Sequence, residues 1–256
     1  MSTNQDDSNS HLPELSRRGL LAAGGLGVAS LYLAKSAHAG SELLKAGMRP
    51  GAVKSVTGAT LPANAAPLSQ QYLVSYNNSV GATYKCLDFY ESVYSRAPLA
   101  DNFSTSLVRI NSNFQIVPGV AHSWKQTSPK TWEFYITPGI MWTDGNEVTA
   151  NDFVETFRYS ADPKHAFDFS WYWSTIGIKN YAAAVAGKAP LSSIGVAVGK
   201  DKYTFVVTTV APVAFIPYAM LYSMPLSAAG LAKYGNALYN VNPATAISMG
   251  PYVLKS

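Results

Sequence analysis

The sequence is poor in charged residues and nearly devoid of cysteine. Of its 256 residues, 13% are charged, and Cys86 is the one cysteine. A single thiol excludes an internal disulfide, and we expect Cys86 to be a small buried hydrophobic residue. The net charge of +4 is modest and scattered, without a basic run that could follow a nucleic-acid backbone. A disulfide scaffold is therefore excluded, and we expect no nucleic-acid partner.

Signatures of catalysis and of metal binding are also missing. Beyond the N-terminal segment the histidines are His122 and His165, each isolated in the sequence. There is no G-x-S-x-G, no H-E-x-x-H and no phosphate-binding G-x-x-x-x-G-K-[ST] motif. We therefore expect no metal, no cofactor and no enzymatic activity, and structural or surface roles for both histidines.

Three nearby carboxylates leave one enzymatic alternative open. A pair drawn from Asp144, Glu147 and Asp152 could serve a secreted hydrolase, with one acid protonated and its partner ionised. In the other interpretation Asp144 forms a turn, Glu147 faces water and Asp152 caps a helix.

The N-terminus has the features of an export signal over residues 1–39. Arg17 and Arg18 precede a Gly/Ala-rich, weakly apolar run over 19–34, and Ala37 and Ala39 are small residues at signal-peptidase positions. A twin arginine before a mildly hydrophobic segment resembles a Tat signal. An uncleaved N-terminal anchor is the alternative. Because Gly40, and not a cysteine, directly follows Ala39, a soluble periplasmic product is favoured over a lipoprotein.

Local patterns predict the order of the elements that follow. Residues 40–70 are rich in Ala, Gly, Pro and Ser, which indicates a flexible linker. We expect a strand over 70–76, and a helix over 90–106 that is interrupted near Pro98. Two strands, 107–110 and 114–117, should then flank a polar turn at 111–113.

Residues 131–163 carry the clearest pattern. Trp132, Phe134 and Ile136 alternate with polar residues, which predicts a half-buried strand that ends at Pro138-Gly139. After a second turn at Asp144-Gly145, Thr149 and Asp152 form a capping-box pair before a helix that stops at Asp162-Pro163. The helix should bury Phe153, Val154, Phe157 and Ala161.

The aromatic run over 167–177 contains Trp171, Tyr172 and Trp173 in succession, which cannot all share one face of a helix or strand. It forms either a hydrophobic mini-core beneath a loop or a wall on which a ligand stacks. A helix over 180–188, two strands around a turn at 200–202 and helices within 215–224 and 227–235 should follow. A turn at 248–250 enters a final strand. The alternation indicates a mixed α/β or α+β fold.

Four motifs occur in the order found in a known family: Pro118-Gly119-Val120-Ala121-His122-Ser123-Trp124, then 137–145, then 148–153, and SMGPYVL at 248–254. Together they resemble family 5 extracellular solute-binding proteins, the dipeptide- and oligopeptide-binding components of ABC importers. Two positions depart from the pattern: Thr143 stands where the family has His, and Ser248-Met249 begin the last motif.

The resemblance implies a periplasmic binding protein-like fold of type II, in the peptide-binding cluster. It implies that 108–243 form an inserted lobe, while 71–107 and 244–256 belong to the first lobe. A third, C-terminal lobe supplies most ligand contacts in that family and is missing from this sequence. We therefore expect the chain to be an N-terminal fragment.

The resemblance also implies a site and partners. Leu87-Asp88-Phe89 is similar to a family loop after which Ser92, Val93 and Tyr94 would lie at the cleft edge, unless these are ordinary helix-start residues. Trp171 and Trp173 are the candidate stacking residues. The expected partners are a peptide or another small solute and the membrane permease, with the protein as a monomer. An oligosaccharide, an opine-like compound or a metal chelate are alternative ligands.

Overall fold

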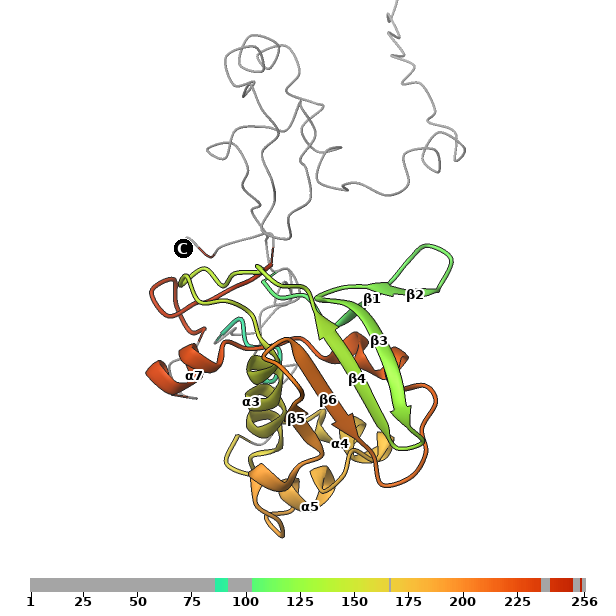
Figure 1. Ribbon diagram of the computed structural model, residues 1–256. Coiled ribbons are helices and arrows are strands. Elements are labelled where there is room, and N and C mark those ends of the chain that lie inside the picture. The colour runs from blue at the N-terminus through green and yellow to red at the C-terminus, as the bar shows by residue number, and fades with distance from the viewer. Residues whose placement is uncertain (1–85, 92–102, 166, 236–239, 251–253, 255–256) are drawn as a thin grey trace, which may run out of the picture.

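The computed structural model describes residues 86–91, 103–165, 167–235, 240–250 and 254 (Figure 1). The predicted signal peptide, linker and strand over 70–76 lie outside these ranges. So do Ser92, Val93, Tyr94 and most of the predicted final strand. The predictions for those segments stay predictions.

A four-stranded antiparallel sheet forms the centre of the described structure. Its order is β3-β4-β6-β5, so the hairpin β3–β4 and the hairpin β5–β6 meet where β4 pairs with β6. Because every pair of named strands described is antiparallel, the fold is of the α+β kind. The strands are β3 (Ala121–Ser128), β4 (Thr131–Ile136), β5 (Val196–Val198) and β6 (Thr204–Thr208).

The alternation predicted for β4 is confirmed. Phe134 and Ile136 are fully buried, whereas Glu133 and Tyr135, which alternate with them, are partly exposed. Trp132, on the same face, is partly buried, and its indole N–H donates to the Val213 carbonyl at 3.0 Å. The strand thus buries one face and binds the loop that follows β6 at its end.

Helix α3 (Ala150–Ala161) begins where the sequence predicted. Thr149 has extended backbone angles, and its N–H donates to Oδ2 of Asp152 at 2.7 Å. The other carboxylate oxygen of Asp152 accepts the N–H of Ala228 at 2.9 Å. Asp152 therefore caps α3 and also fixes the start of α7 (Ala228–Tyr234).

One face of α3 covers the sheet (Figure 1). Phe153 and Phe157 are buried, and both rings contact the ring of Phe205 on β6, at centroid distances of 5.4 and 5.7 Å. Val154 and Ala161 are buried as well, as predicted. Burying each such aromatic side chain contributes roughly 1.5–3 kcal/mol, so this contact dominates the core.

The hairpin of β1 (Val108–Ile110) and β2 (Ile116–Pro118) forms a separate two-stranded ribbon. It projects away from the sheet (Figure 1). The prediction that the second strand begins at Phe114 was wrong, because Phe114 has φ 59° and belongs to the turn.

The predicted helix over 90–106 is wrong where it can be checked. Tyr90 and Glu91 form a turn and a bend, and residues 103–106 have no helical conformation. Their backbone groups bond to distant segments instead: the Ser106 carbonyl accepts the Val120 N–H at 3.0 Å, and the Phe103 carbonyl accepts the Met249 N–H at 3.1 Å. Long-range pairing thus replaces the local helix.

Short helices also occur in the described structure. Those within 180–188, 215–224 and 227–235 were predicted, whereas those at 170–176 and 191–193 were not. Cys86 differs from its prediction, because it is only half-buried. The helices are α4 (Ser170–Ile176), α5 (Tyr181–Val185), η5 (Leu191–Ser193), α6 (Ile216–Ala219) and η6 (Met220–Tyr222).

We expect Asp152→Ala to lower the free energy of unfolding by about 2–3 kcal/mol, because it removes the cap and leaves the Ala228 N–H without its acceptor. Urea denaturation measures this. Asp144→Ala is the control: Asp144 accepts hydrogen bonds from Asn146 in an exposed turn, so its loss should cost less than 1 kcal/mol. Equal costs would contradict the double role of Asp152.

Candidate functional site

Four aromatic side chains gather on the surface where α4 meets η6, and we call them the aromatic patch: Phe169, Trp171, Tyr172 and Tyr222. Phe169 is central, with centroid distances of 4.8 Å to Trp171, 5.1 Å to Tyr172 and 5.6 Å to Tyr222. Tyr172 also contacts Tyr222 at 5.0 Å. Edge and offset contacts of this kind are the favoured arrangements of aromatic pairs, so the four rings pack against one another.

The patch continues along the exposed face of α6 and η6. Phe215, Tyr218 and Tyr222 follow at spacings of three and four residues, which places them on one helical face, and all three are exposed. Ile216 and Met220 are fully buried on the opposite face. The solvent-facing side of α6 and η6 therefore carries aromatic residues where polar residues are usual.

The two candidate tryptophans have different environments. Trp171 is 57% exposed at the edge of the patch, whereas Trp173 is 1% exposed and contacts Phe157 of α3 at 4.8 Å. The hypothesis that Trp173 stacks on a ligand is therefore corrected, because two residues along a helix place a side chain on a different face. For Trp171, stacking on a ligand stays a prediction.

Tyr90 connects this patch to the segment that leads to Ser92. Its ring lies 5.2 Å from that of Phe167, and its hydroxyl donates to the Met224 carbonyl at 2.8 Å. Glu91 is the last described residue before Ser92, Val93 and Tyr94, whose predicted role stays a prediction. Tyr90, which lies two residues before Ser92, is therefore held beside the aromatic patch.

A buried carboxylate fixes Tyr90 in turn. Asp88 is 3% exposed and accepts hydrogen bonds from the Tyr90 N–H at 2.7 Å and from the Tyr159 hydroxyl at 2.5 Å. Burial raises the pKa of Asp88 and also that of Tyr159. Tyr159 belongs to α3, so Asp88 joins the entry segment to the main helix.

Both histidines have the structural or surface roles predicted. The His165 ring lies 3.9 Å from that of Tyr159, and its Nε2 is 2.7 Å from the Tyr90 carbonyl, which can only accept. His122 is exposed, beside Tyr135 at 6.4 Å. Neither is arranged as the base of a catalytic triad.

The three carboxylates of the hydrolase alternative each make structural contacts. Asp144 and Asp152 form the predicted turn and cap. The prediction that Glu147 simply faces water was wrong: its carboxylate accepts hydrogen bonds from Lys202 at 2.6 Å, Tyr203 at 2.7 Å and the Gly139 N–H at 2.8 Å. These contacts lower the pKa of Glu147 to about 2, and the hydrogen bond from Lys202 is the largest cause, followed by that from Tyr203.

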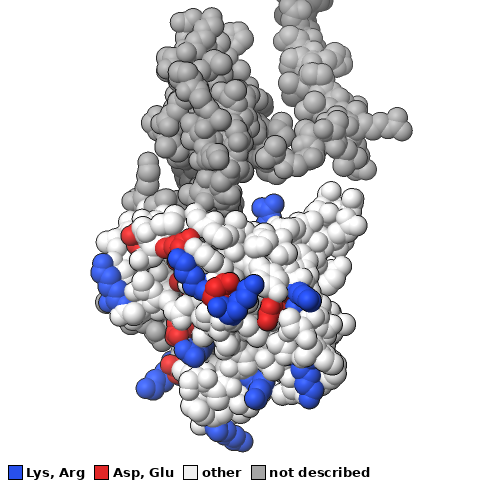
Figure 2. All heavy atoms as spheres, viewed as in Figure 1, with Lys and Arg blue, Asp and Glu red and all other residues white. Residues whose placement is uncertain are grey.

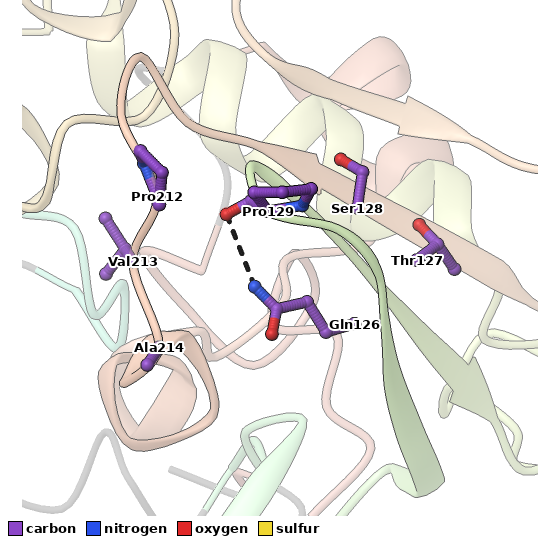
Figure 3. Close-up of a pocket in the computed structure, with 7 residues that line it drawn as sticks. All are labelled: Gln126, Thr127, Ser128, Pro129, Pro212, Val213 and Ala214. Atoms are coloured by element: carbon purple, nitrogen blue, oxygen red, sulfur yellow. Dashed lines mark hydrogen bonds between the residues drawn. The ribbon is translucent and has the colours of Figure 1, made fainter.

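A hollow of about 440 Å³ lies between the β3–β4 turn and the loop before α6 (Figure 3). None of its lining side chains is charged. Gln126 donates to the Pro129 carbonyl at 3.3 Å within it. The hollow could hold a neutral group but offers no charged anchor. Its lining residues are Gln126, Thr127, Ser128, Pro129, Pro212, Val213 and Ala214.

The face seen in Figure 2 mixes acidic and basic side chains without a large region of one sign. The described residues contain no group of three or more His, Cys, Asp or Glu suited to a metal ion. Within the same ranges, no helix has the length and apolar character needed to cross a membrane.

The aromatic run over 167–177 that the sequence singled out contains three of the four residues of the patch, Phe169, Trp171 and Tyr172. Tyr222 and the neighbouring Tyr90 were not singled out, because their contacts join segments up to 132 residues apart, as in the 3.4 Å hydrogen bond from Tyr90 to the Tyr222 carbonyl. The spacing of Phe215, Tyr218 and Tyr222 was a usable signal, because it predicts one aromatic helical face.

The fold is that of the periplasmic peptide-binding proteins, of which it forms an incomplete, mixed α/β part. Residues 115–256, more than half of the chain, match the family described as bacterial extracellular solute-binding proteins, family 5 Middle. The chain belongs to this family, as its motifs indicated.

The chain matches only part of the length of each relative. The chain is 30% identical over 209 residues to the periplasmic oligopeptide-binding protein OppA of Salmonella typhimurium, covering 80% of this chain and 37% of OppA. It is 32% identical over 200 residues to the probable deoxycholate-binding periplasmic protein YgiS of Escherichia coli, with 77% and 36% covered. The structure of Haemophilus influenzae OppA in complex with RPPGFSPFR has a TM-score of 0.62 and 30% identity, over 69% of this chain and 34% of that one. The chain thus spans little more than a third of these proteins.

The Glu147 contacts predict a dependence of stability on pH. Because the pKa of Glu147 is lowered from 4.5 to about 2 on folding, its contribution is present above about pH 4.5 and is lost as the pH falls through about 2. Acid titration followed by circular dichroism should show a flatter profile over this window for Glu147→Gln.

Lys202→Met is the matched variant for this titration, because Lys202 is the main cause of the low pKa. It should move the acid transition to higher pH while leaving Glu147 ionised at pH 7. An unchanged transition in both variants would show that this cluster does not contribute to acid stability.

Proposed function

We propose that this chain is part of a periplasmic solute-binding component of an ABC importer, which captures peptides and delivers them to the membrane permease. Membership of the family supports the binding role. The names of relatives that bind oligopeptides support the ligand class. The proposal rests chiefly on the aromatic patch with its exposed Trp171 and Tyr222, because such rings offer contact area to apolar side chains while Tyr hydroxyls can bond a peptide backbone.

Export through a Tat-type signal is part of this proposal. Arg17 and Arg18 would be read by the export machinery, and cleavage after Ala39 would release the protein into the periplasm. The periplasmic location given in the relatives' names is consistent with this route.

In the proposed lobe arrangement, 108–243 form the inserted lobe, and 71–107 and 244–256 contribute to the first lobe. Hydrogen bonds between these parts support a shared rigid unit. The Leu87 N–H donates to the Asn240 carbonyl at 3.0 Å, and the Thr143 N–H donates to the Ser248 carbonyl at 2.8 Å. Closure around a ligand would then occur against a further part of the complete protein.

The Tyr172 hydroxyl joins α4 to α6 at the patch. Burial raises the pKa of Tyr172 to about 12, so this hydroxyl stays protonated and donates to the Ala219 carbonyl at 3.2 Å. That bond holds α4 against α6 in the absence of a ligand. A preformed surface loses less conformational entropy on binding.

A second candidate ligand is an amphipathic steroid. The name of YgiS, which is 32% identical to this chain, points to deoxycholate. The apolar face of a steroid would also offer contact area to Trp171 and to the helical face that carries Tyr218. Direct comparison of deoxycholate with a peptide distinguishes the two candidates.

We expect Trp171→Ala to weaken binding of the peptide RPPGFSPFR by roughly three- to tenfold, the equivalent of about 0.5–1.5 kcal/mol for one aromatic contact. Its melting temperature should not change, since Trp171 is mostly exposed. Isothermal titration calorimetry of the full exported protein measures the affinity, with deoxycholate titrated in parallel.

Trp173→Ala is the control two residues away, and it should cost about 3–5 kcal/mol of stability because Trp173 is buried. If Trp171→Ala bound the peptide as tightly as the parent protein, the patch would not be the contact surface. If neither peptide nor deoxycholate bound the parent, the proposed ligand classes would be wrong.

A further inference from the structure

A buried tyrosine holds the backbone from which the aromatic patch presents Tyr222. The side chain of Tyr90 is 1% exposed. Its hydroxyl donates to the Met224 carbonyl at 2.8 Å, and the Tyr222 carbonyl lies 3.4 Å from the same oxygen. Both carbonyls belong to the end of η6 and the segment directly after it. One hydroxyl thus fixes the chain on both sides of Ser223.

The position of the Tyr222 ring depends on this backbone. Tyr222 is 44% exposed, and its ring contacts those of Phe169 and Tyr172. It is the last residue of η6, a 3₁₀ helix of three residues. Such short helices have poor internal hydrogen-bond geometry, so bonds from other segments contribute more to the placement of their side chains.

The ring of Tyr90 supports the patch by a second route. It lies 5.2 Å from the Phe167 ring, which in turn lies 6.3 Å from that of Phe169. Phe169 contacts Tyr222 at 5.6 Å, so the contacts return to the residue whose carbonyl lies near the Tyr90 hydroxyl. Tyr90 therefore contacts the supports of two patch residues at once.

Tyr90 is itself anchored to the centre of the structure. Its N–H donates to Oδ1 of Asp88 at 2.7 Å, and its carbonyl lies 2.7 Å from Nε2 of His165. The other oxygen of Asp88 accepts the hydroxyl of Tyr159, which belongs to α3. A donor held in this way restricts the movement of its acceptor, because the bond is lost if the acceptor moves alone.

We infer that Tyr90 is a positioning residue of the peptide-binding surface, whose hydroxyl holds the end of η6 so that Tyr222 is placed for contact with the peptide. This inference rests on the proposed function. Tyr90 is too deeply buried to contact the peptide, so its effect on affinity passes through Tyr222.

The first test is a double-mutant cycle between the two tyrosines. Tyr90→Phe keeps the ring and its contact with Phe167, and removes the hydroxyl alone. Isothermal titration calorimetry of the full exported protein should show that Tyr90→Phe weakens binding of RPPGFSPFR by roughly three- to fivefold. Tyr222→Ala should weaken binding at least as much. Adding Tyr90→Phe to Tyr222→Ala should then cause no further loss of affinity.

Tyr181→Phe is the matched control for a purely structural effect. Tyr181 is fully buried, and its hydroxyl lies 2.8 Å from Oγ of Ser160, so the change also removes one buried hydrogen bond of the same length. Both single Tyr→Phe variants should lower the melting temperature by about 2–4 °C. Tyr181→Phe should bind RPPGFSPFR as the parent protein does.

The second test measures the backbone without any ligand. Hydrogen exchange followed by mass spectrometry should show that amides of 220–224 exchange roughly three- to tenfold faster in Tyr90→Phe, because the local opening of η6 becomes easier. The same amides should exchange at the parent rate in Tyr181→Phe.

Three outcomes would overturn the inference. These are parent affinity in Tyr90→Phe, an equal loss of affinity from Tyr90→Phe with and without Tyr222→Ala, and unchanged exchange over 220–224. The second outcome would show that Tyr90 acts through another contact. A parent protein that does not bind RPPGFSPFR would reject the proposed ligand class together with the inference, whereas binding that ignores Tyr90→Phe would reject the inference alone.

Discussion

The contact of α3 with the sheet is the constraint on which the other features depend. An antiparallel sheet with one apolar face must cover it, and Phe153 and Phe157 do so against Phe205. Trp173 packs on the same Phe157 ring from α4. The position of α4, and with it the exposure of Trp171, therefore follows from how α3 covers the sheet.

Buried polar groups then join segments that are distant in sequence to this core. Asp152 binds α7, and Asp88 binds Tyr159 of α3 and the Tyr90 N–H, so both carboxylates are fully used in connections. Burial raises the pKa of each, since it disfavours the charged form. The hydrogen bonds that each carboxylate accepts offset this desolvation cost, since a buried N–H or hydroxyl without an acceptor would itself be destabilising.

Two surface features depart from what stability alone would favour. The aromatic face of α6 and η6 exposes rings that the core could have used, and the hairpin tip keeps Phe114 where glycine would fit. In a protein whose turns and caps otherwise agree with local preferences, such departures concentrate at sites of interaction.

The local elements could be predicted from the sequence: β4 from its alternation, the start and stop of α3 from Thr149, Asp152 and Asp162-Pro163, and the family from its motifs in order. These features depend on side chains a few residues apart. Other features became clear from the folded structure alone: Trp171 is exposed while Trp173 is buried, Glu147 binds Lys202, and residues 103–106 bond to distant segments instead of forming a helix. Those outcomes depend on contacts between segments far apart in the chain, which periodicity and turn chemistry do not encode.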